Sequence, residues 1–116
     1  MVQPVRQTPI PGGAELDLAE KTTDLSIAIG SVASVVVAQP NLHRTALWLI
    51  NNSDVEVYLG LGRPATVASG IRLNAAGGAI ELNLINLFRG QIQAIAASGA
   101  DKGLLILELE TRYAYT

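Results

Sequence analysis

The chain has 116 residues, a length that fits one domain with its own hydrophobic core. It has no cysteine and a single histidine, which excludes a disulfide framework, a thiol nucleophile and a metal site built from two histidines. Its 8 basic and 10 acidic residues give a net charge of −2, so nucleic acid is not the expected ligand. With 16% charged and 49% hydrophobic residues, polar side chains are too few to cover an ordinary monomer, which predicts an oligomer or a partner surface.

The first part of the chain differs in composition from the rest and predicts an extended N-terminal arm, residues 1–24, ahead of a folded domain, residues 25–116. Three of the five prolines lie in this arm, and proline fixes φ and lacks the N–H that a central strand donates. The charges between residues 15 and 24 also fit a short helical turn, and a frayed terminus explains the stretch as well as an arm does. No signal peptide is expected, because no positive start followed by an apolar run begins the chain.

From residue 25 onward, short apolar segments alternate with turns, which predicts an all-β domain of about seven or eight short strands. Segment 44–51 is apolar on both faces, as expected for a strand that is covered on both sides. The turns recur about every 8–12 residues and no amphipathic helix is present, so we expect an antiparallel β-sandwich or a small jelly-roll-like barrel. Period-two alternation, which is typical of strands with one buried face, is clearest in segments 55–61, 80–84, 92–96 and 105–110.

No residue is assigned a catalytic, cofactor-binding or metal-binding role, so the sequence predicts a protein that is not an enzyme and has no cofactor. His43 lies beside a cation, and no Gly-x-Ser-x-Gly elbow presents a serine to it. Glu108 and Glu110 share a strand face, where paired carboxylates could serve acid–base or calcium chemistry. A solvated outer face explains them better, with Leu105, Leu107 and Leu109 on the opposite face of the strand.

A series of segments in fixed order resembles a known class of protein. The series is Arg44–Ser53, Val57–Gly62, Gly70–Leu73, Gly77–Leu82, Gly90–Ile95 and Leu104–Glu110. It resembles the small β-sandwich decoration, or cement, proteins on the capsids of tailed bacteriophages. The resemblance implies a virion structural protein that is assembled in the host cytoplasm and located on the capsid surface. Its expected partners are the phage major capsid protein and further copies of itself, with a trimer favoured.

The same pattern also resembles small modules of phage tails and fibres, which implies an alternative function in binding a receptor or a carbohydrate. A sugar site needs exposed aromatic side chains with polar neighbours. Trp48 fits a buried position better than an exposed stacking platform. Such a site would therefore have to use Tyr58, Tyr113 or Tyr115.

Two sets of contact residues are expected. The face of the two-sided strand that does not meet the core is assigned to the interface between copies, through Ala46, Trp48 and Ile50. The arm has apolar residues held between prolines, and two turns carry exposed cations, one of them beside a phenylalanine that could also tuck under its own loop. These elements give the expected contacts with the capsid: Val2, Val5, Arg6, Ile10, Arg63, Phe88 and Arg89. A membrane is not an expected partner, because polar residues and Pro40 interrupt the long charge-free stretch.

Overall fold

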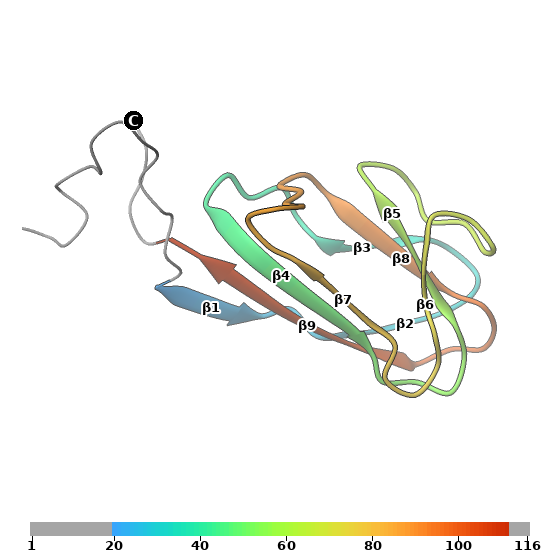
Figure 1. Ribbon diagram of the computed structural model, residues 1–116. Helices are drawn as coiled ribbons and strands as arrows, with labels where there is room; N and C mark the ends of the chain where they lie inside the picture. Colours follow the sequence, from blue (N-terminus) through green and yellow to red (C-terminus); the bar gives the residue numbers. More distant parts are fainter. Residues whose placement is uncertain (1–19, 112–116) are drawn as a thin grey trace, which may run out of the picture.

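The computed structural model describes residues 20–111, and the all-β prediction is confirmed. These residues contain nine antiparallel strands in two sheets, packed as a β-sandwich, and no helix (Figure 1). The first sheet contains β1 (Lys21–Asp24), β2 (Ile27–Ile29), β4 (Arg44–Asn51), β7 (Ala79–Leu82) and β9 (Lys102–Glu110). The second sheet contains β3 (Val35–Ala38), β5 (Val57–Leu61), β6 (Ile71–Leu73) and β8 (Ile92–Ala96).

The two longest strands, β4 and β9, lie side by side in the middle of the first sheet. The strand order is β1-β9-β4-β7. Strands β1 and β2 lie on the same edge of β9, where β1 pairs with residues 107–110 and β2 with residues 102–104. The second sheet has the order β3-β8-β5-β6. Because β4 and β9 each have a partner on both sides, their outward-facing side chains form the centre of one whole face of the molecule.

Strand β1 corrects the predicted boundary between arm and domain. Lys21 pairs with Glu110 and Asp24 with Leu107, and the N–H of Glu20 donates to the carbonyl of Glu110 at 2.9 Å. The sheet therefore begins at Lys21, and residues 21–24 are extended, contrary to the helical turn considered for them. The β-branched pair Thr22-Thr23 favours a strand, and β9 offers it an unpaired edge. The predicted contacts Val2, Val5, Arg6 and Ile10 lie outside the described residues.

The core lies between the two sheets, and β9 turns toward it the face that we expected outside. Leu104 and Ile106 are fully buried, and Glu108 is 7% exposed, whereas Leu105 is 42% exposed. The predicted orientation of this strand is therefore wrong. Both orientations bury aliphatic side chains, because the strand is apolar at consecutive positions, and Arg44 provides the inward-facing glutamate with a partner. The core side chains come mainly from β4, β5, β8 and β9: Leu47, Leu49, Val57, Leu59, Ile92, Ala94, Ala96, Leu104 and Ile106.

Gly60 allows the chain to fold back over the end of β5. A Cβ at this position would collide with the carbonyl oxygen of Arg63 and lie 2.8 Å from that of Pro64. Only glycine lets the Arg63-Pro64 backbone approach so closely. The turn predicted from Gly62-Arg63-Pro64 is thus fixed against the sheet, and the N–H of Gly62 donates to Gln91 at 2.7 Å.

Candidate functional site

The outer face of the β4–β9 pair is apolar. Three cross-strand pairs lie in succession: Ala46 with Leu109, Trp48 with Leu107, and Ile50 with Leu105. Residues directly opposite each other on antiparallel strands share a face and contact each other. Trp48 and Leu105 are each 42% exposed, so the expectation that Trp48 is buried is wrong, and the other four are half-buried. We call these six residues the outer apolar face; they include all three predicted interface residues.

Carboxylates flank the outer apolar face on both sides. Asp24 of β1 lies opposite Leu107, and Glu81 of β7 lies opposite Trp48, so one row across the sheet has a carboxylate at each end. Hydrogen bonds from the side chain and the backbone N–H of Ser26 lower the pKa of Asp24 below its ordinary value, so its carboxylate stays charged to a lower pH than that of a free aspartate. The apolar centre therefore has an acidic border.

The outer apolar face contains two open hollows. One, of about 380 Å³, is lined by Trp48, Ile50, Ala79, Ile80 and Glu81. The other, of about 280 Å³, includes Asp24, Ser26 and Leu105 and shares the same two β4 side chains. Each hollow has room for an aliphatic side chain of a partner, and the indole of Trp48 contributes to the wall of both.

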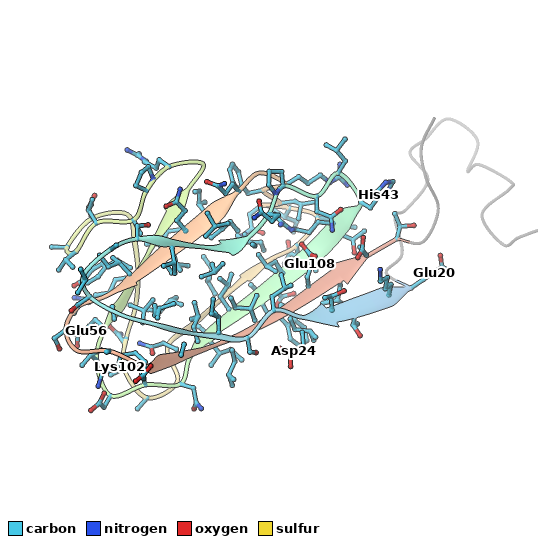
Figure 2. The ribbon with its side chains drawn as sticks, turned by 180° about the vertical axis from the view of Figure 1, so that it is seen from behind. Glu20, Asp24, His43, Glu56, Lys102 and Glu108 are labelled. Carbon is cyan, nitrogen blue, oxygen red and sulfur yellow. The ribbon has the colours of Figure 1, made fainter. Side chains whose placement is uncertain are left out.

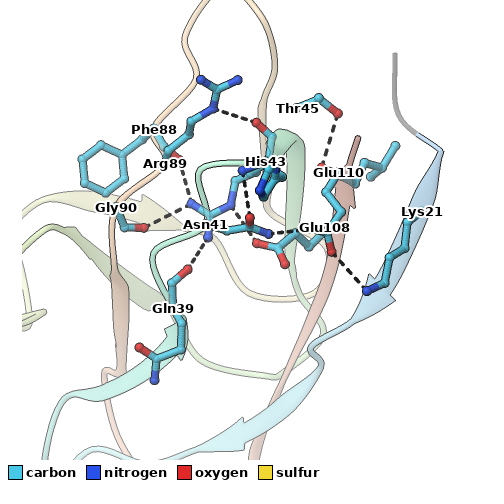
Figure 3. A network of polar contacts seen from close by, with 12 residues as sticks. Lys21, Gln39, Asn41, His43, Thr45, Phe88, Arg89, Gly90, Glu108 and Glu110 are labelled. Atoms are coloured by element: carbon cyan, nitrogen blue, oxygen red, sulfur yellow. Dashed lines mark hydrogen bonds and ion pairs between the residues drawn. The ribbon is translucent and has the colours of Figure 1, made fainter. Parts of the chain in front are cut away.

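On the inner side of the same strands, a polar network closes one end of the sandwich (Figure 3). Arg44 is fully buried, and its Nε donates to Oε2 of Glu108 at 2.8 Å. Its terminal nitrogens donate to the carbonyls of Phe88 at 2.7 Å, Gly90 at 3.1 Å and Gln39 at 2.7 Å. The prediction that Glu108 lies on a solvated face is wrong, because its carboxylate is the buried counter-ion of Arg44.

Glu110, the other predicted member of the carboxylate pair, is also part of the framework. Its Oε2 accepts a hydrogen bond from Asn41 at 3.2 Å, and its Oε1 lies 3.7 Å from Nζ of Lys21. The two carboxylates therefore have separate structural partners. This arrangement serves to join the 39–43 loop and β1 to the end of β9.

The predicted contact residues of the two turns gather at this same end. Phe88 is half-buried and packs against the core, with its ring beside Gly62 and beside Gly90 of its own loop, so it lies under that loop. Nε of Arg89 donates to the carbonyl of Arg44 at 2.9 Å, and Arg63 is exposed. Figure 2 shows Glu20 and His43 at this end of the sandwich, and Glu56 and Lys102 at the opposite end.

Several large apolar side chains outside the predicted contacts are exposed, among them Val32 and Leu42, and two adjacent ones form the turn between β7 and the loop that leads to β8. Its two central residues are Leu84, which is 54% exposed, and Ile85, which is 95% exposed. Turn centres usually carry glycine, asparagine, aspartate or serine. Two aliphatic residues in a turn between Asn83 and Asn86 could therefore have indicated an exposed contact surface from the sequence alone.

Comparisons with known proteins give no independent indication of function. No protein-family model matches the chain, and no curated protein or solved structure matches it. Within residues 20–111, no group of three or more histidine, aspartate or glutamate side chains could hold a metal ion. The same residues include no helix that has the length and apolar character needed to cross a bilayer. The candidate site is therefore defined by geometry, as the outer apolar face with its acidic border.

Proposed function

We propose that this protein is a structural, non-enzymatic component of a phage virion that self-associates through the outer apolar face and decorates the capsid. The observation that supports self-association most strongly is the set of three apolar cross-strand pairs on the outside of a sheet. An antiparallel sheet with one solvated face normally alternates between apolar and polar residues, whereas contiguous exposed apolar patches mark interfaces.

Covering the exposed part of Trp48 alone makes an appreciable contribution to association. A tryptophan side chain buries about 150–250 Å², so the 42% of Trp48 that is exposed corresponds to roughly 100 Å². At about 25 cal/mol per Å², covering that area contributes roughly 2.5 kcal/mol. Tryptophan is also enriched among the residues that dominate interface energies.

The role on a capsid is supported by the sequence resemblance and by the separation of two surfaces. The outer apolar face belongs to the middle of one sheet, whereas Arg63, Phe88 and Arg89 lie at one end of the sandwich. A protein that binds copies of itself through the face and the major capsid protein through the end can make both contacts at once. We propose a trimer on the capsid exterior, with the capsid-binding end supplied by these turns.

Sedimentation velocity and binding to bare capsids of the phage that encodes the chain test this proposal. The wild-type protein is expected to sediment as an oligomer and to pellet with the capsids. Trp48→Ser should reduce the oligomer, whereas Val67→Ser, a matched change at a 46% exposed loop position, should not. A wild-type protein that stays monomeric and leaves the capsids bare would show that the proposal is wrong.

One observation favours carbohydrate binding by a tail or fibre module as a second candidate function. Trp48 is exposed between hollows that also contain Asp24, Ser26 and Glu81, which combines a stacking surface with hydrogen-bonding groups. Among residues 20–111 the exposed aromatic is Trp48, whereas Tyr58 is half-buried; Tyr113 and Tyr115 lie outside the described residues. A glycan array followed by titration of Trp48 fluorescence tests it: a sugar that changes the emission supports the second function, and the absence of any bound glycan rejects it.

A further inference from the structure

The Asn83–Asn86 turn is held in one conformation by its own side chains. Oδ1 of Asn86 accepts the N–H of Asn83 at 2.8 Å, and Oδ1 of Asn83 accepts the N–H of Ile85 at 2.9 Å. The backbone N–H of Asn86 donates to the carbonyl of Asn83 at 3.2 Å. The side-chain Nδ2 of Asn86 donates to the carbonyl of Glu81 at 3.2 Å. The backbone of Leu84 and Ile85 is therefore ordered before any partner binds, which lowers the entropic cost of binding.

The tip of this turn does not pack on its own chain. Ile85 is 95% exposed and Leu84 is 54% exposed, so neither side chain fills the hollow beside Trp48 of the same molecule. The hydrogen bond from Asn86 to Glu81 keeps the turn at the end of β7. Two aliphatic side chains on a rigid support are thus available to a second molecule.

Charge decides which surface fits the outer apolar face. Two such faces packed against each other would bring the carboxylates of Asp24 and Glu81 on one copy near those on the other, and like charges across an interface are unfavourable. The segment from Asn83 to Phe88 is uncharged. It can enter a face with an acidic border without placing a like charge beside either carboxylate.

We propose that the Leu84–Ile85 tip of one copy inserts into the hollow of about 380 Å³ beside Trp48 of the next copy. This inference rests on the proposed self-association and names the surface that fills the outer apolar face. The tip and the hollow are different surfaces of the chain, and in the proposed arrangement each copy inserts its tip into the next copy, which is a head-to-tail contact. Head-to-tail contacts close into rings when the rotation between copies allows it, and three of them would complete the proposed trimer.

A mixing experiment with two variants tests the inference. The tip variant, Ile85→Asp, keeps its hollow, and the face variant, Trp48→Ser, keeps its tip. Each variant alone should self-associate at least about 30-fold more weakly than the wild type, the effect of losing one dominant contact residue. Mixed in equal amounts, they retain one intact contact and should form a one-to-one heterodimer in sedimentation velocity.

The single tryptophan of the chain reports the contact directly. Because the face variant has no tryptophan, all tryptophan emission of the mixture, excited selectively over the tyrosines, comes from Trp48 of the tip variant. Adding the face variant should shift this emission to the blue, as Leu84 and Ile85 of the added protein cover the indole. The Val67→Ser protein should assemble as the wild type does, and circular dichroism shows whether each variant is folded.

Each outcome bears on one proposal. A heterodimer with a blue shift confirms that the tip of one copy enters the hollow of another, and a wild-type oligomer of more than two copies in sedimentation velocity confirms that the contact is head-to-tail. If Ile85→Asp assembles and emits as the wild type does, the inference is wrong, while self-association through the face by another arrangement still stands. If the wild type is monomeric at all concentrations and its emission does not change with concentration, both the inference and the proposed self-association fail. If the face variant does not fold, the emission of Ile85→Asp against that of the wild type gives the same decision.

Discussion

The two faces of the β4–β9 pair differ in how their unusual side chains are covered. Inside the sandwich, Arg44 and Glu108 are buried, while on the outside Trp48 and Leu105 are each 42% exposed. The inner charges are compatible with burial because the guanidinium of Arg44 donates four hydrogen bonds, to one carboxylate and three carbonyl oxygens of the same chain. The outer side chains have no equivalent cover among residues 20–111. The inner face is thus complete in one molecule, and the outer face is suited to a second one.

Because of this difference, substitutions on the two faces should change different measured properties of the protein. Changes on the inner face should alter the free energy of unfolding, because the partners of each group belong to the same chain. Changes on the outer apolar face should mainly alter association. The following substitutions compare the faces at neighbouring or paired positions.

The largest effect is expected from Arg44→Met. It leaves the carboxylate of Glu108 buried without its cation and removes the donors of three carbonyl groups. Breaking a buried pair on one side costs about 3–5 kcal/mol. Urea denaturation followed by circular dichroism should show this loss. The double variant Arg44→Met with Glu108→Leu should recover part of it, because no charge then remains buried.

The second comparison uses two adjacent residues of β4. Leu49 is fully buried and Ile50 is half-buried on the outer apolar face. Leu49→Ala should lower the free energy of unfolding by about 2–5 kcal/mol, the usual cost of a core cavity. Ile50→Ala should cost much less in the monomer and should weaken association instead. Equal losses of stability from both variants would contradict the division between the faces.

A smaller effect is expected from neutralising the acidic border with Asp24→Asn and Glu81→Gln. In the head-to-tail contact, the uncharged tip meets these carboxylates, so the association constant should change by less than about threefold and depend little on salt. If two outer faces instead packed against each other, neutralisation would strengthen association markedly at low salt. Sedimentation equilibrium at two ionic strengths distinguishes the two arrangements.

The smallest effect concerns pH and Asp24 alone. The pKa of its carboxyl is lowered in the folded protein by hydrogen bonds from Ser26, so the folded state binds this proton less readily than the unfolded state does. Its contribution to stability is present above the unfolded pKa of about 4 and is lost as the pH falls through the folded pKa. Asp24→Asn should therefore lower thermal stability slightly at pH 7 and flatten the further loss of stability as the pH falls below about 4.

The sequence predicted the fold class because alternation marks individual strands, and most predicted strand segments overlap strands of the structure. It did not predict which way β9 faces. Leu104 to Leu107 are four consecutive aliphatic residues, so their alternation does not distinguish the buried face. The residue that does, Arg44, lies 64 positions before Glu108, and their contact exists only in the folded chain.

The sequence predicted only part of the candidate site, because the rest depends on contacts that form only in the folded chain. Ala46, Trp48 and Ile50 share a face by spacing alone, whereas the leucines opposite them depend on the register of β9. The turn at Leu84 and Ile85 was passed over because its aliphatic residues resemble the end of a strand. Its conformation depends on side chains of Asn83 and Asn86 that bond to the backbone, which no periodicity reveals.

The position of β9 in the sheet has a consequence for biosynthesis. It is the last of the nine strands in chain order, yet it is the sole strand partner of β1 and of β2 among the described residues and it also pairs with β4. During translation, β1 and β2 leave the ribosome long before the strand that completes their hydrogen bonds. A nascent chain that stops before Lys102 would expose unpaired edges on β1, β2 and β4, which are sites for pairing with other chains. We therefore expect the first sheet to be completed only after translation has passed Glu110, although β4 and β7 can pair earlier.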